Sequence, residues 1–134
     1  MADPFLCEIR LFACNFAVHG FAKTEGQILP ISQNTAMFSL LGTYYGGNGV
    51  STFALPDLRD KSPIGVGQGP GLPNYDIGQT DNVSTYTPSV VATAATPASP
   101  IQAIAFSGVP VNTRAPFLTL NYLIATAGIF PARP

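Results

Sequence analysis

The sequence predicts a single small domain over residues 1–134, mainly β, with one short helix near residues 32–41 and an extended arm near residues 82–100. Hydrophobic residues make up 46% of the chain, which is enough to build one core. Glycine and proline, 13 of each, indicate many turns between short strands. No apolar run reaches the ~20 residues of a transmembrane helix, so we expect no membrane insertion.

The first strand is expected over residues 5–16, followed by a short strand over residues 21–25. Alternation along the first strand separates two sets of side chains, Ile9, Leu11 and Ala13 on one face and Glu8, Arg10 and Phe12 on the other. Two charges on an otherwise apolar strand suggest that one face is open or pairs with a neighbour. Pro30 excludes a central strand around residues 28–31 because proline has no N–H for a ladder.

The helix is expected to begin after Ser32, whose hydroxyl can cap a free backbone N–H. Its apolar stripe consists of Ala36, Met37, Leu40 and Leu41. Gly42 is the expected terminator, since glycine accepts a positive φ. A helix of ~10 residues is marginal alone, so the stripe should pack on the sheet.

The middle of the chain is rich in turn signals. A loop at residues 46–49 precedes a strand at residues 50–55, and the charged run at residues 57–61 predicts a salt-bridged turn. Glycines alternate through residues 65–71, but Pro70 and Pro73 forbid the helix that a phosphate loop requires. We expect a close-packed backbone ribbon there.

Residues 82–100 are rich in Thr, Ala, Ser, Val and Pro. They fit either a flexible surface loop or an arm that pairs with a sheet edge of a neighbouring copy. The candidate arm residues are Val83, Tyr86, Val90 and Val91. Further strands are expected within residues 101–106, 117–125 and 129–130.

Charged residues make up only 10% of the chain, against about 25% in a typical domain, and the net charge is −1. The scattered basic residues exclude a nucleic-acid interface and a polybasic membrane patch. A weakly charged surface favours a chain packed against copies of itself, although a compact neutral monomer also fits.

No arrangement of residues predicts an enzyme, a metal site or a cofactor. His19 is the single histidine and lies in an expected turn, without a motif around any serine. Zinc normally takes four protein or water ligands, and Cys7, Cys14 and His19 are three residues at non-standard spacing.

The two cysteines are the sharpest single feature. On one straight strand Cys7 and Cys14 are about 23 Å apart and on opposite faces, whereas a disulfide needs Cα atoms within ~7 Å. They are then either two small buried apolar residues or a link between copies, Cys7 of one chain meeting Cys14 of the next. A bend near Leu11 would permit an internal bond instead.

Four segments together resemble the phage tail-collar family, most closely its microcystin-dependent branch. They are FLCEIRLFACNFA at residues 5–17, EGQILPISQNTAMFSLLGTYYGGNG at 25–49, TFALPDLRDKSPIGVGQGPGL at 52–72 and PFLTLNYLIATAGIFPARP at 116–134. The resemblance implies a structural part of a phage tail fibre, which trimerises and attaches to host receptors, and implies no active site.

The chain departs from the family pattern in three ways. The family usually has glycine at Cys7 and Cys14, and a tryptophan and a Cys-Asp pair near residues 21–25. It often has a longer, histidine-containing middle segment, where histidines bind metal in some tail fibres. This chain has no histidine there, so we do not transfer metal binding.

We therefore expect a structural subunit that assembles with copies of itself into an extracellular filament or phage-tail-like fibre. The alternative is a tip protein that binds a host glycan or receptor, with Tyr44, Tyr45 and Tyr75 as contact candidates. The expected location is extracellular or on a virion or tail appendage, and the first residues lack the features of a secretion signal.

Overall fold

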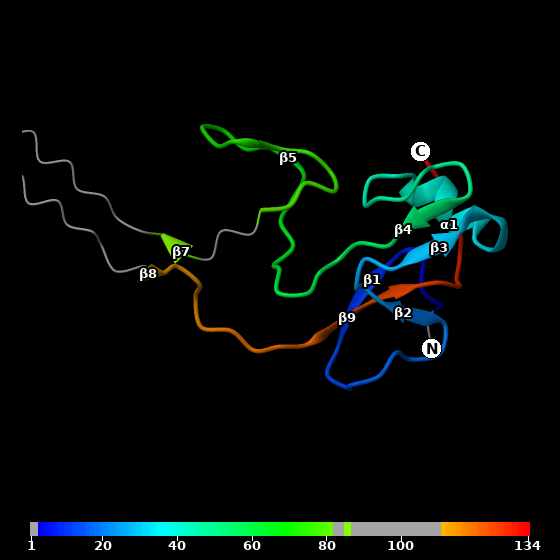
Figure 1. The fold of residues 1–134 in the computed structure, drawn as a ribbon, viewed down its shortest axis with the longest axis horizontal. Coiled ribbons are helices and arrows are strands. Elements are labelled where there is room, and N and C mark those ends of the chain that lie inside the picture. The colour runs from blue at the N-terminus through cyan, green and yellow to red at the C-terminus, as the bar shows by residue number, and fades with distance from the viewer. Residues whose placement is uncertain (1–2, 82–84, 87–110) are drawn as a thin grey trace, which may run out of the picture. The chain divides into compact units, whose positions relative to one another are not determined.

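The computed structural model describes residues 3–81, 85–86 and 111–134. Its elements, in order, are β1 (Ile9–Phe12), β2 (Phe21–Lys23), β3 (Ile28–Pro30), the 3-10 turn η1 (Ile31–Gln33), α1 (Thr35–Leu41), β4 (Thr52–Ala54), β5 (Gly67–Gln68), β6 (Asn74–Tyr75), β7 (Thr85–Tyr86), β8 (Val111–Asn112) and β9 (Asn121–Ala125) (Figure 1). The predicted class, mainly β with one short helix, is confirmed. Contacts within the chain divide it into two units, Met1–Thr80 with Thr119–Pro134, and Asp81–Leu118.

The centre of the first unit is an antiparallel sheet in the order β1-β9-β2. The last strand therefore lies between the first two, and Ile124 of β9 is opposite both Ile9 and Ala22. Four predicted strands are shorter than expected, since β2 and β4 each cover only three residues of the ranges 21–25 and 50–55, and β1 and β9 are also shortened. The strand expected over residues 5–16 is confined to β1 because a turn occupies the residues before it, and only the last five residues of the expected strand at 117–125 form β9.

A second ribbon, β3 with β4, and the helix cover part of this sheet (Figure 1). The buried residues that form the core are Leu6, Met37, Leu41, Phe53, Leu55 and Ile124. The Phe53 ring, which is fully buried, lies 5.8 Å from the Phe38 ring, centroid to centroid. Burial of these side chains supplies most of the driving force, at about 1.5–3 kcal/mol for each large one.

The helix begins later than predicted. Ser32 lies in η1 rather than at the N-cap, which is Asn34, and no side chain caps the helix there. The apolar stripe is also shifted: Met37 and Leu41 are buried, but Ala36 is exposed. Gly42 ends the helix with φ 52°, as expected for a glycine terminator.

The alternating glycines form an open ribbon rather than the close-packed one that we expected. β5 pairs with β6 in a two-residue antiparallel ladder. A Cβ built at Gly65, Gly67 or Gly71 would meet no atom within 4 Å, so packing does not require these glycines.

In the second unit β7 pairs with β8, with Thr85 opposite Asn112. Of the candidate arm, Tyr86 belongs to β7, whereas Val83, Val90 and Val91 lie outside the described residues, as does the strand expected at 101–106. Across the described ranges, no helix has the length and apolar character needed to cross a bilayer.

Candidate functional site

The turn that precedes β1 holds Cys7 in an unusual conformation. Glu8 N–H donates to the Phe5 carbonyl (3.0 Å), which closes a four-residue turn with Cys7 at its third position. Cys7 has φ 67°, and Leu6 is not among the described residues with positive φ, so the turn is of type II. This position normally carries glycine because an L side chain is strained there.

The same residue also begins a β-bulge. Cys7 N–H donates to the Ala125 carbonyl (3.0 Å), and Ala125 N–H donates to the Glu8 carbonyl (2.8 Å). Two residues of one strand thus face a single residue of β9, with a positive φ at the first, which is the glycine-type bulge. The turn and the bulge together favour glycine at the position that Cys7 occupies in this chain.

An ion pair follows the bulge on β1. The Arg10 guanidinium donates to both Glu8 carboxylate oxygens (2.8 and 3.2 Å) and lies 5.9 Å from the centroid of the Phe21 ring. Phe12 packs edge-on against Phe21 at 5.3 Å. The hydrogen bonds from Arg10 hold the pKa of Glu8 below its ordinary value. Glu8 and Arg10 therefore lie on one face of the sheet as a fixed charge pair.

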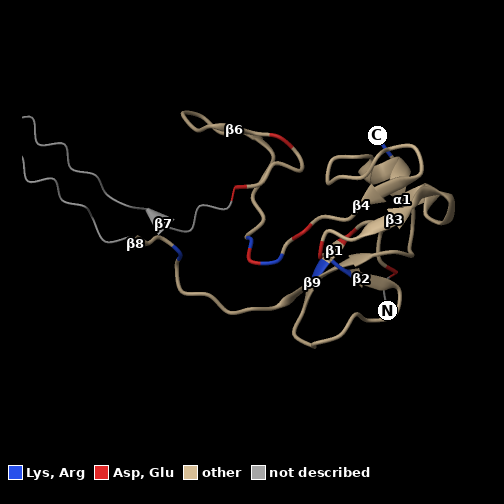
Figure 2. Ribbon diagram, viewed as in Figure 1, with Lys and Arg blue, Asp and Glu red and all other residues tan. Residues whose placement is uncertain are grey.

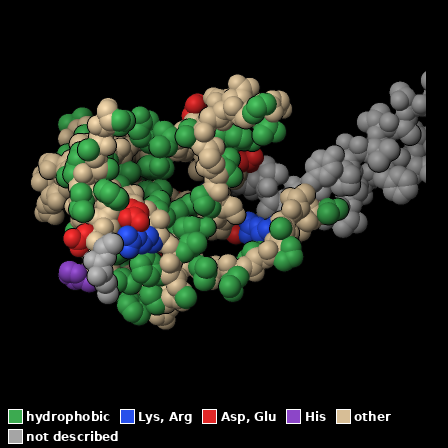
Figure 3. All heavy atoms as spheres, turned by 180° about the vertical axis from the view of Figure 1, so that it is seen from behind, with side chains coloured by type: hydrophobic (Ala, Val, Ile, Leu, Met, Phe, Trp, Pro, Cys, Tyr) green, Lys and Arg blue, Asp and Glu red, His purple; other side chains and the backbone are tan. Residues whose placement is uncertain are grey.

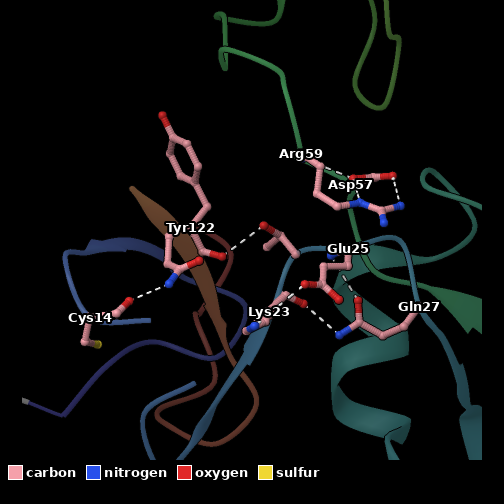
Figure 4. Close-up of polar contacts among 9 residues, drawn as sticks. Cys14, Lys23, Glu25, Gln27, Asp57, Arg59 and Tyr122 are labelled. Atoms are coloured by element: carbon pink, nitrogen blue, oxygen red, sulfur yellow. Dashed lines mark hydrogen bonds and ion pairs between the residues drawn. The ribbon is translucent and has the colours of Figure 1, made fainter. Parts of the chain in front are cut away.

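A second charged group lies where the chain leaves β4 (Figure 4). The predicted salt-bridged turn is confirmed there: Arg59 donates to both oxygens of Asp57 (2.9 and 2.8 Å). These bonds hold the pKa of Asp57 well below its ordinary value. Lys23 and Glu25 form a longer, exposed pair at 3.9 Å. Exposed pairs of this kind fix local geometry and add little stability.

Two side chains link the central strand to the segments on either side of it (Figure 4). The Thr24 hydroxyl donates to the Tyr122 carbonyl (2.9 Å), and the Asn121 amide donates to the Cys14 carbonyl. Asn48 fixes the loop before β4, because its side-chain oxygen accepts hydrogen bonds from three backbone N–H groups, those of residues 50–52. None of these three roles was predicted from the sequence, although Asn48 lies in the loop expected at residues 46–49.

Both cysteines are free thiols and half-buried. Cys7 packs against the core, and burial raises the pKa of its thiol to about 11. The Cys14 thiol lies 3.6 Å from the Phe16 carbonyl. The structure therefore places Cys7 among apolar residues, where thiolate formation is unfavourable.

The three candidate tyrosines differ in environment. Tyr44 is 59% exposed, whereas Tyr45 packs against the core and burial raises the pKa of its hydroxyl. Tyr75 lies in β6 and is half-buried. Only Tyr44 therefore offers a largely open ring.

Charges are sparse on the described surface. Neither α1 nor β4 carries one (Figure 2), and hydrophobic side chains occupy much of the face in Figure 3. His19 lies at the surface in that view. Among the described residues, no three His, Cys, Asp or Glu side chains are close enough to hold a metal ion.

Comparison with known families gives one match. Residues 7–63 match the family model of the Phage Tail Collar Domain. This segment is a phage tail collar domain. It contains the bulge at Cys7, β1 to β4 and the helix, and the collar family is structural and non-catalytic. No curated protein matches the chain.

Proposed function

We propose that the protein is a structural subunit that associates with copies of itself in a phage tail, a tail-like appendage or an extracellular filament. The observation that carries this proposal is the tail collar domain at residues 7–63. The four segments quoted from the sequence also favour the microcystin-dependent branch of that family. The assembled protein then belongs outside the cell or on a virion.

The described surface supports an assembled state. Large apolar side chains are more than half exposed at many positions, among them Phe16, Val50, Phe117 and Leu118. With charges at 10% of the chain, few ionic groups separate these side chains. Surfaces of this kind usually mark contacts with other protein chains.

The test is negative-stain electron microscopy combined with sedimentation velocity, in the presence and absence of reductant. We expect concentration-dependent assemblies. If disulfides between Cys7 and Cys14 link the copies, reductant should shorten the assemblies. Assemblies of unchanged size refute the disulfide link but leave the structural role standing. A monomer at every concentration refutes the structural role.

The second candidate function is recognition of a host glycan at the tip of such an appendage. The open ring of Tyr44 beside a glycine-rich loop favours it, since aromatic rings stack on sugars. The measurement is binding of wild-type protein and of Tyr44→Ala to a glycan array. Equal signals from both would exclude Tyr44 as the contact.

A further inference from the structure

The edge strands of the β1-β9-β2 sheet and of the β3-β4 ribbon differ in whether their outward N–H and carbonyl groups have hydrogen-bond partners. In an antiparallel ladder, alternate residues direct their N–H and carbonyl groups to the partner strand, and the others direct them outward. An outward row without partners is a template for another strand. The strands with an outer edge in this sheet and this ribbon are β1, β2, β3 and β4.

On the other three edges the chain itself closes some of the outward groups. On β2, Phe21 N–H donates to the Val18 carbonyl (2.9 Å) and the Gln27 side chain donates to the Lys23 carbonyl (2.7 Å). On β3, Pro30 has no N–H, and its carbonyl accepts from the Asn34 side chain (3.0 Å).

The outward groups of β4 are closed by the glycine loop before it. Ala54 N–H donates to the Gly46 carbonyl (3.1 Å), and the Thr52 carbonyl accepts from Gly49 N–H (3.0 Å).

The outer edge of β1 has no such closure within the described residues. The bulge and the register direct the backbone groups of Arg10 and Phe12 to β9, so those of Ile9 and Leu11 point outward. No described strand other than β9 pairs with β1. The Ile9 and Leu11 side chains are 40% and 54% exposed, so the open edge is also apolar.

We propose that β1 pairs, antiparallel and about a two-fold axis, with β1 of a second copy. This inference rests on the proposed self-assembly and names the surface for one of its contacts. The resulting sheet would have the order β2-β9-β1-β1-β9-β2. A two-fold contact of this kind uses the same patch on both copies.

Charge complementarity selects the second copy and the register. Two outward residues must face each other, and the register that pairs Ile9 with Ile9 puts Arg10 opposite Glu8 of the second copy. Glu8 and Arg10 already share one face, so four alternating charges would lie side by side across the axis. A shift by two residues, with Ile9 opposite Leu11, would place Arg10 against Arg10 and is disfavoured.

The first experiment is sedimentation velocity in reductant on wild type, Leu11→Lys and Ile28→Lys. Both substitutions place a lysine at an exposed aliphatic position on an edge strand, since Ile28 is 58% exposed on β3, whose outer edge is interrupted by Pro30. We expect Leu11→Lys to reduce the size of the assembly and to raise the dissociation constant of the lost contact at least tenfold, with Ile28→Lys unchanged. Circular dichroism checks that each variant is folded.

The outcomes separate the two proposals. Wild type that assembles, with both lysine variants assembling equally well, overturns the β1 contact and leaves the structural role standing. Wild type that stays monomeric overturns both.

A charge exchange then tests the register. Glu8→Arg and Arg10→Glu should each weaken the contact, because like charges then face each other across the axis. A mixture of the two variants should restore it. Failure of the mixture to associate, with both variants folded, overturns the register.

Discussion

Cys7 offers a direct test of the backbone conformation at the bulge. Its φ of 67° is unfavourable for any L residue by about 1–2 kcal/mol, and glycine avoids this cost. At an ordinary strand position the order is reversed, because glycine is about 0.5–1 kcal/mol less stable than alanine. The sign of the difference in unfolding free energy between Cys7→Ala and Cys7→Gly therefore tells a positive-φ position from an ordinary strand position.

We expect Cys7→Gly to be more stable than Cys7→Ala by about 0.5–1 kcal/mol, the difference between those two terms. Both variants lose the sulfur, so its half-buried packing cancels from the comparison. Relative to wild type, Cys7→Ala should lose up to about 0.8 kcal/mol, since one group of methylene size leaves a half-buried place.

The assay is urea unfolding at low protein concentration in reductant, with equal slopes required for the comparison. The control is the pair Leu11→Ala and Leu11→Gly on the same strand, where glycine should be the less stable variant. If glycine is also the less stable residue at position 7, the reasoning about the bulge is wrong.

Three further predictions concern other parts of the first unit. Gly47→Ala should destabilise by about 3 kcal/mol or more, because a Cβ there would lie 2.4 Å from the β4 backbone at φ 91°, whereas urea unfolding should show almost no loss for Gly65→Ala, which meets open space. Because the pKa of Asp57 is lowered in the folded protein, its contribution to stability is complete above the ordinary carboxyl pKa and is lost as pH falls toward the lowered value. In Asp57→Asn the midpoint of urea unfolding should therefore depend less on pH between about pH 5 and 2, the range in which carboxyls titrate. A pH dependence equal to that of wild type would contradict the ion pair. The variant Cys14→Ala leaves Cys7 as the single thiol. At pH 8 a thiol reagent should react about 100-fold more slowly with the native variant than with the urea-unfolded variant, because a pKa raised from 9.0 to about 11 lowers the thiolate fraction by that factor. Equal rates would show that Cys7 is not shielded.

Local sequence signals predicted several elements well. Gly42 marked the end of α1, and Pro30 excluded a central strand, since β3 belongs to a two-stranded ribbon; the effects of glycine and proline act on the residue itself and its neighbours. The charged turn at Asp57 was also predicted, because Arg59 lies within reach along the chain. Alternation predicted strands around β1 and β9 but overestimated their lengths.

The tertiary structure decided the features that join distant segments. The sequence by itself determined a mainly β chain with one short helix, few charges and a tail-collar pattern, because composition and local propensity are properties of each segment. It could not place β9 between β1 and β2, or show that Cys7 occupies a glycine bulge opposite Ala125, because both depend on strands more than 100 residues apart. It also could not show which strand edges are closed, since that depends on where loops return in space. Only the fold shows that, within the described residues, the outward groups of Ile9 and Leu11 on β1 have no partner strand.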